Sequence, residues 1–236
     1  MFTSSYNEII GLPGSGKSYA CKILVDHAKK QNIVLQTRQP LNLSVFDRFY
    51  IVIKVLRFLI INREMLKWWM IQPLRAYTVN PHTRKIVRNL KFRVIIESII
   101  IQKIQKNNSI KILNDEGIIG KIVVLSLLLN RDTIDVLRLL KVLLPDNTRI
   151  LFIDIEVHKA LKQMLERGVY LPFWDEMDPT QRHKLCQDCN TRYLEICLKW
   201  FQITKGNYYI ITNNGTKQDL ASSLISIFDL NNYQFA

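Results

Sequence analysis

The chain has 236 residues, of which 48% are hydrophobic, and its 33 Lys and Arg residues against 20 Asp and Glu residues give a formal net charge of +13. A chain of this length can build one well-packed domain, and this apolar content excludes a disordered polymer. Four cysteines in such a chain do not indicate a disulfide scaffold. The sequence has no recognisable signal peptide and no apolar run long enough to cross a bilayer, which predicts a cytoplasmic protein.

Short apolar runs alternate with helical patterns along the whole chain. The runs predicted to be strands cover residues 6–10, 33–36, 110–113, 149–154 and 208–212. The patterns predicted to be helices cover residues 17–30, 44–61, 64–70, 82–106, 119–129, 133–143, 157–167, 181–201 and a last segment ending near 228. This alternation predicts an α/β fold in a single domain, residues 1–236, with a five-stranded parallel sheet covered by helices on both faces.

The strand at 6–10 and the helix at 17–30 are joined by the sequence G-L-P-G-S-G-K-S at residues 11–18. This spacing is typical of the P-loop of nucleotide-binding proteins, in which glycines let consecutive backbone N–H groups surround a phosphate at a helix N-terminus. Lys17 would reach the β- and γ-phosphates, and the Ser18 hydroxyl would bind Mg²⁺. The predicted nucleotide contacts are Gly11, Pro13, Gly14, Ser15, Gly16, Lys17, Ser18, Tyr19 and, after the last strand, Asn213.

The positive charge is concentrated in one segment. Between residues 38 and 106, 14 Lys and Arg residues oppose three acids, so this segment carries +11 and the rest of the chain only +2. We therefore predict a basic helical insertion over residues 44–106. Within it, Arg84, Arg88 and Lys91 fall at i, i+4 and i+7 and share one helix face. They are candidates for binding an anionic group of a substrate, and a solvated basic surface is the alternative.

The same insertion also contains apolar and aromatic residues, at 49–61 and at Trp68 and Trp69. Apolar residues interleaved with cations are typical of a helix lying at a membrane interface. They are equally typical of a buried helix with tryptophans in the core, and this is the favoured interpretation. No nucleic-acid-binding signature accompanies the charge, so no nucleic-acid partner is expected.

One cluster has metal-ligating residue types. His183, Cys186 and Cys189 lie within seven residues of each other, and Cys197 follows. Zinc sites with this composition normally include a second pair of ligands at similar spacing, which the chain lacks. Packing of these cysteines inside a helix is therefore the favoured interpretation, and zinc the alternative.

Five motifs in chain order resemble the thymidylate kinase-like branch of the P-loop small-molecule kinases. They are the P-loop at 11–18, Thr37-Arg38-Gln39-Pro40 after the second strand, Asp115-Glu116-Gly117 after the third, Phe152-Ile153-Asp154-Ile155 leading to Glu166-Arg167-Gly168, and Trp174-Asp175-Glu176 before Tyr193-Leu194. The motifs cover most of the chain, although only the P-loop is specific by itself. The resemblance implies a P-loop kinase that uses ATP and Mg²⁺, with a lid over residues 168–182.

The departures from this family fall where the family holds its acceptor. Gln39 stands in place of a Glu, Leu41 and Asn42 in place of glycines, and Glu116 in place of an Arg. These changes argue against dTMP and favour another acceptor. Kinases of this broad branch occur with surface-polysaccharide genes, so a sugar or glycan hydroxyl is the leading expectation. A nucleoside-monophosphate kinase is the first alternative. The second, of another class, is a basic nucleotide-binding adaptor at a nucleic acid or at the inner face of a membrane.

Within that resemblance, five residues outside the P-loop are candidates for the chemistry. Asp115 would orient Mg²⁺ through water or accept a proton from a hydroxyl, and Glu116 could take the second role. Arg167 and Arg182 flank the expected lid and could stabilise charge on the transferring phosphoryl group. Arg38 follows the second strand, close to the expected cleft, and is a candidate for acceptor binding. The alternatives are that Asp115 only caps the following helix and that the arginines occupy surface positions without a role in the chemistry.

Overall fold

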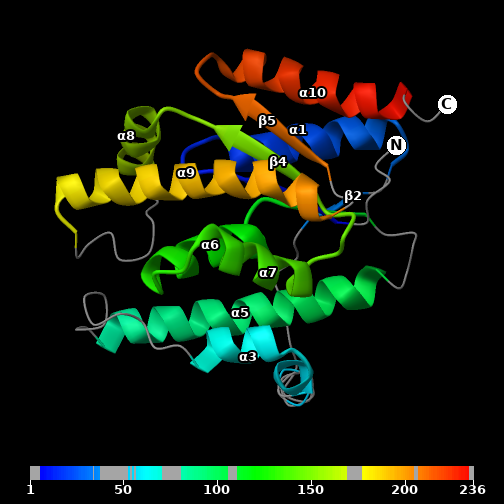
Figure 1. Ribbon diagram of the computed structural model, residues 1–236. Helices are drawn as coiled ribbons and strands as arrows, with labels where there is room; N and C mark the ends of the chain where they lie inside the picture. The colour runs from blue at the N-terminus through cyan, green and yellow to red at the C-terminus, as the bar shows by residue number, and fades with distance from the viewer. Residues whose placement is uncertain are drawn as a thin grey trace.

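A parallel sheet of five strands forms the centre of the molecule (Figure 1). The computed structural model describes residues 6–33, 35–37, 53, 55, 57–70, 81–105, 111–168, 177–204 and 207–233. The strands are β1 Tyr6–Ile10, β2 Leu35–Thr37, β3 Lys111–Asn114, β4 Arg149–Asp154 and β5 Tyr208–Thr212. They lie in the order β2-β3-β1-β4-β5, and all four pairings are parallel. The predicted strand number and sheet type are confirmed, with boundaries shifted by up to two residues.

Helices cover both faces of this sheet, as predicted (Figure 1). The described helices are α1 Lys17–Lys30, α3 Arg63–Met70, α5 Pro81–Gln105, α6 Ile118–Leu128, α7 Thr133–Leu143, α8 Val157–Arg167, α9 Pro179–Ile203 and α10 Lys217–Tyr233. On one face α1 packs against α10, and on the other α6, α7 and α9 pack together. The alternation along β1 explains this division, because Ile9 lies in the apolar cluster beneath α1 and α10 while Tyr6 and Ile10 lie in the larger cluster on the opposite face.

The basic insertion packs onto the larger apolar cluster. Helix α5 contacts α6 and α7, and α3 contacts α7. Of the helix predicted over 44–61, residues 53, 55 and 57–61 are described and are helical, while the remainder lies outside the described residues. Within the described part of the chain, no helix is both long enough and apolar enough to span a membrane.

The sheet order explains where a site should form. Strand β1 lies between β3 and β4, so the loop that follows β1 is flanked by the segments that follow those two strands. Open α/β sheets bind ligands at the carboxyl ends of their strands, where connections leave toward opposite faces. Here α1 follows β1 on one face of the sheet and α6 follows β3 on the other. The carboxyl ends of these two strands are therefore left uncovered between the two helices.

Candidate active site

A cleft of about 870 Å³ lies at this carboxyl edge. We call its first part the donor half, lined by residues from 11–19, 163–167 and 213–220. We call its second part the acceptor half, lined by Glu8, Leu90, Arg93, residues from 115–124, and Tyr193. The two halves meet at Lys17 and Asp115, both of which line the same cavity.

The P-loop has the backbone conformation that its glycines predict. Gly11 has φ +144°, and a Cβ at this position would lie 2.6 Å from the carbonyl oxygen of Ile153 on β4. Gly16 has φ +97° at the start of α1, where it presents no side chain toward the cleft. An L side chain would be strained at both positions because φ is positive, and at Gly11 it would also clash with backbone. The loop therefore presents backbone at the N-terminus of α1, a favourable environment for an anion.

Lys17 is held inside the P-loop. Its Nζ donates hydrogen bonds to the carbonyl oxygens of Gly11, at 2.8 Å, and Leu12, at 2.7 Å. Burial lowers the pKa of Lys17 to about 8, and the nearby carboxylates of Asp115 and Glu116 partly oppose this shift. A bound triphosphate would add negative charge beside the ammonium group and favour its protonated form.

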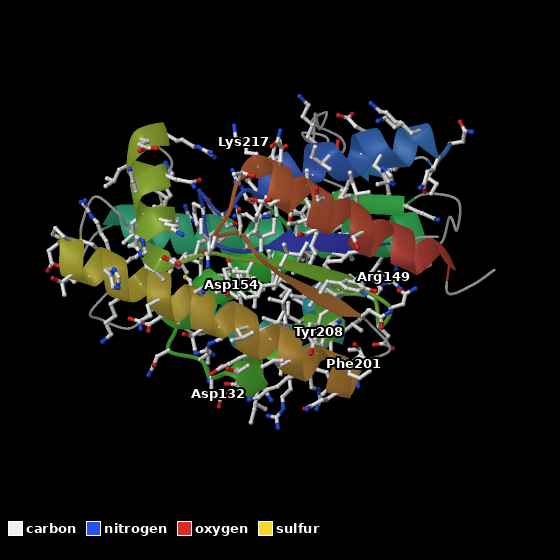
Figure 2. The ribbon with its side chains drawn as sticks, turned by 90° about the horizontal axis from the view of Figure 1, so that it is seen from above. Asp132, Arg149, Asp154, Phe201, Tyr208 and Lys217 are labelled. Carbon is white, nitrogen blue, oxygen red and sulfur yellow. The ribbon has the colours of Figure 1, made fainter. Side chains whose placement is uncertain are left out.

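The loop after β5 is tied to the P-loop by Asn213. The side-chain amide of Asn213 donates to the carbonyl oxygen of Ser15 at 2.7 Å, and its backbone N–H donates to the carbonyl oxygen of Asp154 at 2.7 Å. The Asp154 carboxylate in turn accepts a hydrogen bond from Asn190 of α9 at 2.9 Å. Figure 2 shows Asp154 at the end of β4 and Lys217 at the start of α10. These bonds fix the donor half across three separate loops.

A buried carboxylate supports the acceptor half. Glu8 is only 1% exposed in the middle of β1, and its Oε1 accepts hydrogen bonds from the backbone N–H groups of Ile119, at 2.7 Å, and Gly120, at 3.3 Å. The Tyr6 hydroxyl donates to its Oε2 at 2.9 Å. Burial raises the pKa of Glu8 to about 7, although the Tyr6 hydrogen bond, Lys121 and the Gly120 N–H oppose the shift. Glu8 thus binds the N-terminus of α6 to the central strand.

The turn between β3 and α6 is held from two sides. Glu8 lies so close that a Cβ on Gly117 would be 2.3 Å from the Glu8 Cδ. From the other side, Lys121 Nζ donates to the Gly117 carbonyl oxygen at 3.0 Å, to the Glu116 carbonyl oxygen, and to the Glu97 carboxylate of α5 at 2.9 Å. Asp115 and Glu116 therefore sit on a turn whose backbone is fixed by distant parts of the chain.

Sequence reasoning missed Glu8, Lys121 and Glu97. The signal for Glu8 was present, because a carboxylate inside a short strand predicted to be buried is costly unless it has partners. No such signal exists for Lys121 and Glu97. Their contact depends on how α5 packs against α6, which the sequence alone does not specify.

Most of the predicted donor residues do meet in the cleft. Of all the site residues predicted from the sequence, those that line it are Gly11, Pro13, Gly14, Gly16, Lys17, Ser18, Tyr19, Asp115, Glu116, Arg167 and Asn213. Ser15 is fully buried within the loop. Arg182 lies in the first turn of α9 and is not among the lining residues. Arg38 and residues 169–176 of the expected lid lie outside the described residues.

The predicted acceptor residues of α5 are placed differently. Arg84 and Arg88 are exposed and Lys91 is buried, and none of the three is among the described residues that line the cleft. Leu90 and Arg93 line it instead. Arg93 is nine residues from Arg84, which places it on the opposite side of the helix. Helical spacing alone did not show which face of α5 points to the cleft.

The cysteines of the cluster are not among the described residues that line the cleft. Cys186 and Cys189 are fully buried in the larger apolar cluster, whereas His183 is exposed on α9. Burial raises the pKa of Cys186 to about 12, which is typical of an unreactive core thiol. Among the residues that the structure describes, no group of three or more potential ligands could hold a metal ion. This arrangement agrees with packing of the cysteines inside a helix.

The chain is similar in fold to solved kinases. No protein-family model and no curated protein matches its sequence. A structure of deoxyadenosine kinase from M. mycoides with bound dATP has 13% sequence identity and a TM-score of 0.53, and the match covers 95% of this chain and 99% of that chain. Structures of the same protein with bound dCTP, and with dCMP and a flexible dCDP, have 13% identity and TM-scores of 0.52, covering 95% of this chain and 98% of theirs. At this identity the similarity shows a shared fold and nothing further.

Proposed function

We propose that the chain is an ATP-dependent phosphotransferase whose acceptor is a hydroxyl group of a small molecule. The observation that supports this most strongly is the shared cavity, which places the P-loop lysine Lys17 beside the carboxylate of Asp115. Phosphoryl transfer needs positioning and neutralisation of charge more than covalent chemistry, and these two groups supply both. The fold similarity to deoxyadenosine kinases agrees with this proposal.

The donor half would bind the triphosphate. The backbone N–H groups of residues 14–18 and the Lys17 ammonium would hold the β- and γ-phosphates. Ser18 and Asp115 both line the main cleft and also a neighbouring cavity of about 340 Å³, so two oxygen ligands suited to Mg²⁺ are close together. When bound there, Mg²⁺ would neutralise part of the charge of the β- and γ-phosphates.

The acceptor half would hold the hydroxyl group. Asp115 or Glu116 would accept its proton as the oxygen attacks the γ-phosphoryl group. Arg167, at the end of α8, lines the donor half and would stabilise charge on the group in transfer, and Arg182 remains a second candidate for this role. Leu90 and Arg93 of α5 would contact the body of the acceptor.

The charges of the acceptor half favour a neutral acceptor. Asp115 and Glu116 line it together with the cation of Arg93, while Lys121 is already bound to Glu97 and the buried Glu8 has a pKa raised to about 7. A hydroxyl gains from a nearby carboxylate that accepts its proton, whereas an ionised phosphate oxygen is repelled by it. A nucleoside or a sugar therefore fits this half better than a nucleoside monophosphate. The similarity to deoxyadenosine kinases favours a nucleoside, and the altered acceptor motifs keep a sugar or glycan as the second candidate.

The proposal is tested by incubating the protein with Mg²⁺ and ATP labelled in its γ-phosphoryl group. The acceptors are deoxynucleosides, monosaccharides and oligosaccharides, and dTMP. We expect label in a deoxynucleoside or a sugar, and none when Lys17→Ala replaces the wild-type protein. Efficient labelling of dTMP alone would contradict a neutral acceptor, and transfer that persists in Lys17→Ala would contradict the assignment of the donor half.

A further inference from the structure

Two consecutive helices at the edge of the basic insertion are joined by a single residue. The first is helical at 53, 55 and 57–61, and the second is α3. Asn62 lies between them: its backbone N–H and its side-chain amide both donate to the Phe58 carbonyl oxygen at 2.9 Å. Its carbonyl oxygen accepts from the Leu66 N–H at 3.0 Å, which begins the next helix. Asn62 therefore completes the hydrogen bonding of the first helix and begins that of the second.

The first helix has an inner and an outer face. Val55, Phe58 and Leu59 are buried in the larger apolar cluster, and they fall at i, i+3 and i+4. The outer face carries Ile53, Arg57, Ile60 and Ile61, at i, i+4, i+7 and i+8. Ile53, Ile60 and Ile61 are 51%, 76% and 64% exposed. The interpretation as a helix buried in the core therefore holds for one face, and the other face is open surface.

Helix α3 continues the outer face. Arg63, Leu66, Lys67 and Met70 are all exposed and fall at i, i+3, i+4 and i+7, so one side of the helix presents two cations and two apolar side chains. Met70 is 69% exposed. For Trp68 and Trp69 the structure describes the helical backbone but not the side chains. We call the combined surface the outer patch: Ile53, Arg57, Ile60, Ile61, Arg63, Leu66, Lys67 and Met70.

We propose that the outer patch docks onto the surface of an anionic lipid bilayer. Its eight residues include five apolar side chains and three cations, and none of the eight is an acid. Apolar side chains of a surface helix enter the boundary between head groups and acyl chains, while adjacent Lys and Arg attract anionic lipids. Exposed apolar residues that cluster together mark an interaction site, whereas single ones do not.

The charge of the outer patch argues against other partners. A second copy docked by two-fold symmetry would bring Arg57, Arg63 and Lys67 against the same cations, in an interface whose core is normally depleted of charge. A nucleic acid would contact the three cations but would leave five aliphatic side chains in water. A bilayer accommodates both kinds of side chain.

Docking at the outer patch leaves the nucleotide site accessible. Figure 1 shows α3 beyond α5, on the side away from the sheet and α10. The donor half lies at the sheet edge beside α1 and α10. A docked chain would thus hold its insertion at the lipid surface and keep the donor half in solution.

The test is sedimentation with vesicles of phosphatidylcholine alone or mixed with phosphatidylserine, without nucleotide, so the result is independent of the proposed function. Two variants divide the outer patch: Ile60→Ser/Ile61→Ser/Met70→Ser and Arg57→Gln/Arg63→Gln/Lys67→Gln. Matched controls on other exposed surfaces are Leu198→Ser/Phe201→Ser of α9 and Lys29→Gln/Lys30→Gln/Lys199→Gln. Thermal unfolding checks that every variant is folded.

We expect binding to the phosphatidylserine vesicles that weakens with salt. Because each cation near an anionic surface contributes about fivefold in affinity, the charge variant should bind about a hundredfold more weakly. The apolar variant should lose at least about tenfold, and the control variants should bind as the wild type does. Equal binding by the apolar variant and the wild type, or no binding to either vesicle, would overturn the proposal. A dimer in sedimentation velocity that only the patch variants abolish would identify a second copy as the partner instead.

Discussion

The donor and acceptor halves of the cleft are built in different ways. Residues 11–18 of the donor half are contiguous, and their conformation follows from glycine, lysine and a helix start in one short segment. The acceptor half is assembled from α5, the β3–α6 turn, α9 and a carboxylate on β1. The first half can therefore be recognised from sequence alone, whereas the second depends on packing between segments far apart in the chain. The predictions below test this division, from the largest expected effect to the smallest.

The largest effect is expected at Lys17. Replacing Lys17 by Ala removes the only P-loop cation and should lower kcat at least about a thousandfold, because stabilisation of the transferring phosphoryl group is lost. Steady-state kinetics with the acceptor that becomes labelled from ATP measures this loss. The matched control is Lys30→Ala, an exposed lysine at the other end of α1 that should leave turnover unchanged. Equal losses in both variants would indicate a general effect on α1.

The next effect separates the two carboxylates on the β3–α6 turn. Asp115→Asn should lower kcat about a hundredfold or more, as expected for a lost proton acceptor or metal ligand. Glu116→Gln should cost less, since of the two carboxylates only Asp115 also lines the second cavity, of about 340 Å³, together with Ser18. Turnover of both variants at saturating ATP and acceptor measures the difference. If Glu116→Gln loses more activity than Asp115→Asn, the two roles must be exchanged.

A pair of glycines tests the assembly of the acceptor half. Gly117→Ala should destabilise the protein by about 2–3 kcal/mol, because its Cβ would overlap the buried Glu8 and the Tyr6 hydroxyl. Gly120→Ala should stabilise it by about 0.5–1 kcal/mol, since a Cβ at this helical position would meet only the Tyr193 Oη, at an ordinary contact distance of 3.7 Å. Urea unfolding measures both free energies. If Gly117→Ala left the free energy of unfolding unchanged, the turn would not be held tightly by Glu8.

A smaller effect concerns the protonation of Lys17. Because its pKa is about 8 in the free protein and bound phosphates would raise it, ATP binding near pH 8 should take up a proton. Affinity should be constant below this pH and fall about fivefold between pH 8 and 9, as the free lysine loses its charge. Calorimetry in two buffers of different ionisation enthalpy measures the uptake, and Lys17→Ala should abolish it. Proton release on binding would contradict the expected sign.

The sequence allowed prediction of the sheet, the P-loop and most donor residues, because each depends on local patterns. Apolar runs bounded by turn residues marked the strands, and the loop motif carries its own conformational requirements. The position of Arg93 could not be predicted in this way. A helix with basic residues on several sides has no unique inner face until α5 packs on α6 and α7. The link from Glu8 to the α6 N-terminus spans 111 positions in sequence, beyond the reach of any local pattern.

The central claim is that the acceptor binds where Leu90 and Arg93 line the cleft, opposite the P-loop. The most direct measurement compares Arg93→Gln with Arg88→Gln, an exposed arginine of the same helix that is not among the residues lining the cleft. We expect Arg93→Gln to raise the KM for the labelled acceptor about fivefold and to leave the KM for ATP unchanged, as for loss of one hydrogen bond. Arg88→Gln should change neither constant. If Arg88→Gln raised the acceptor KM and Arg93→Gln left it unchanged, the acceptor would lie on the other face of α5. That result would contradict the account.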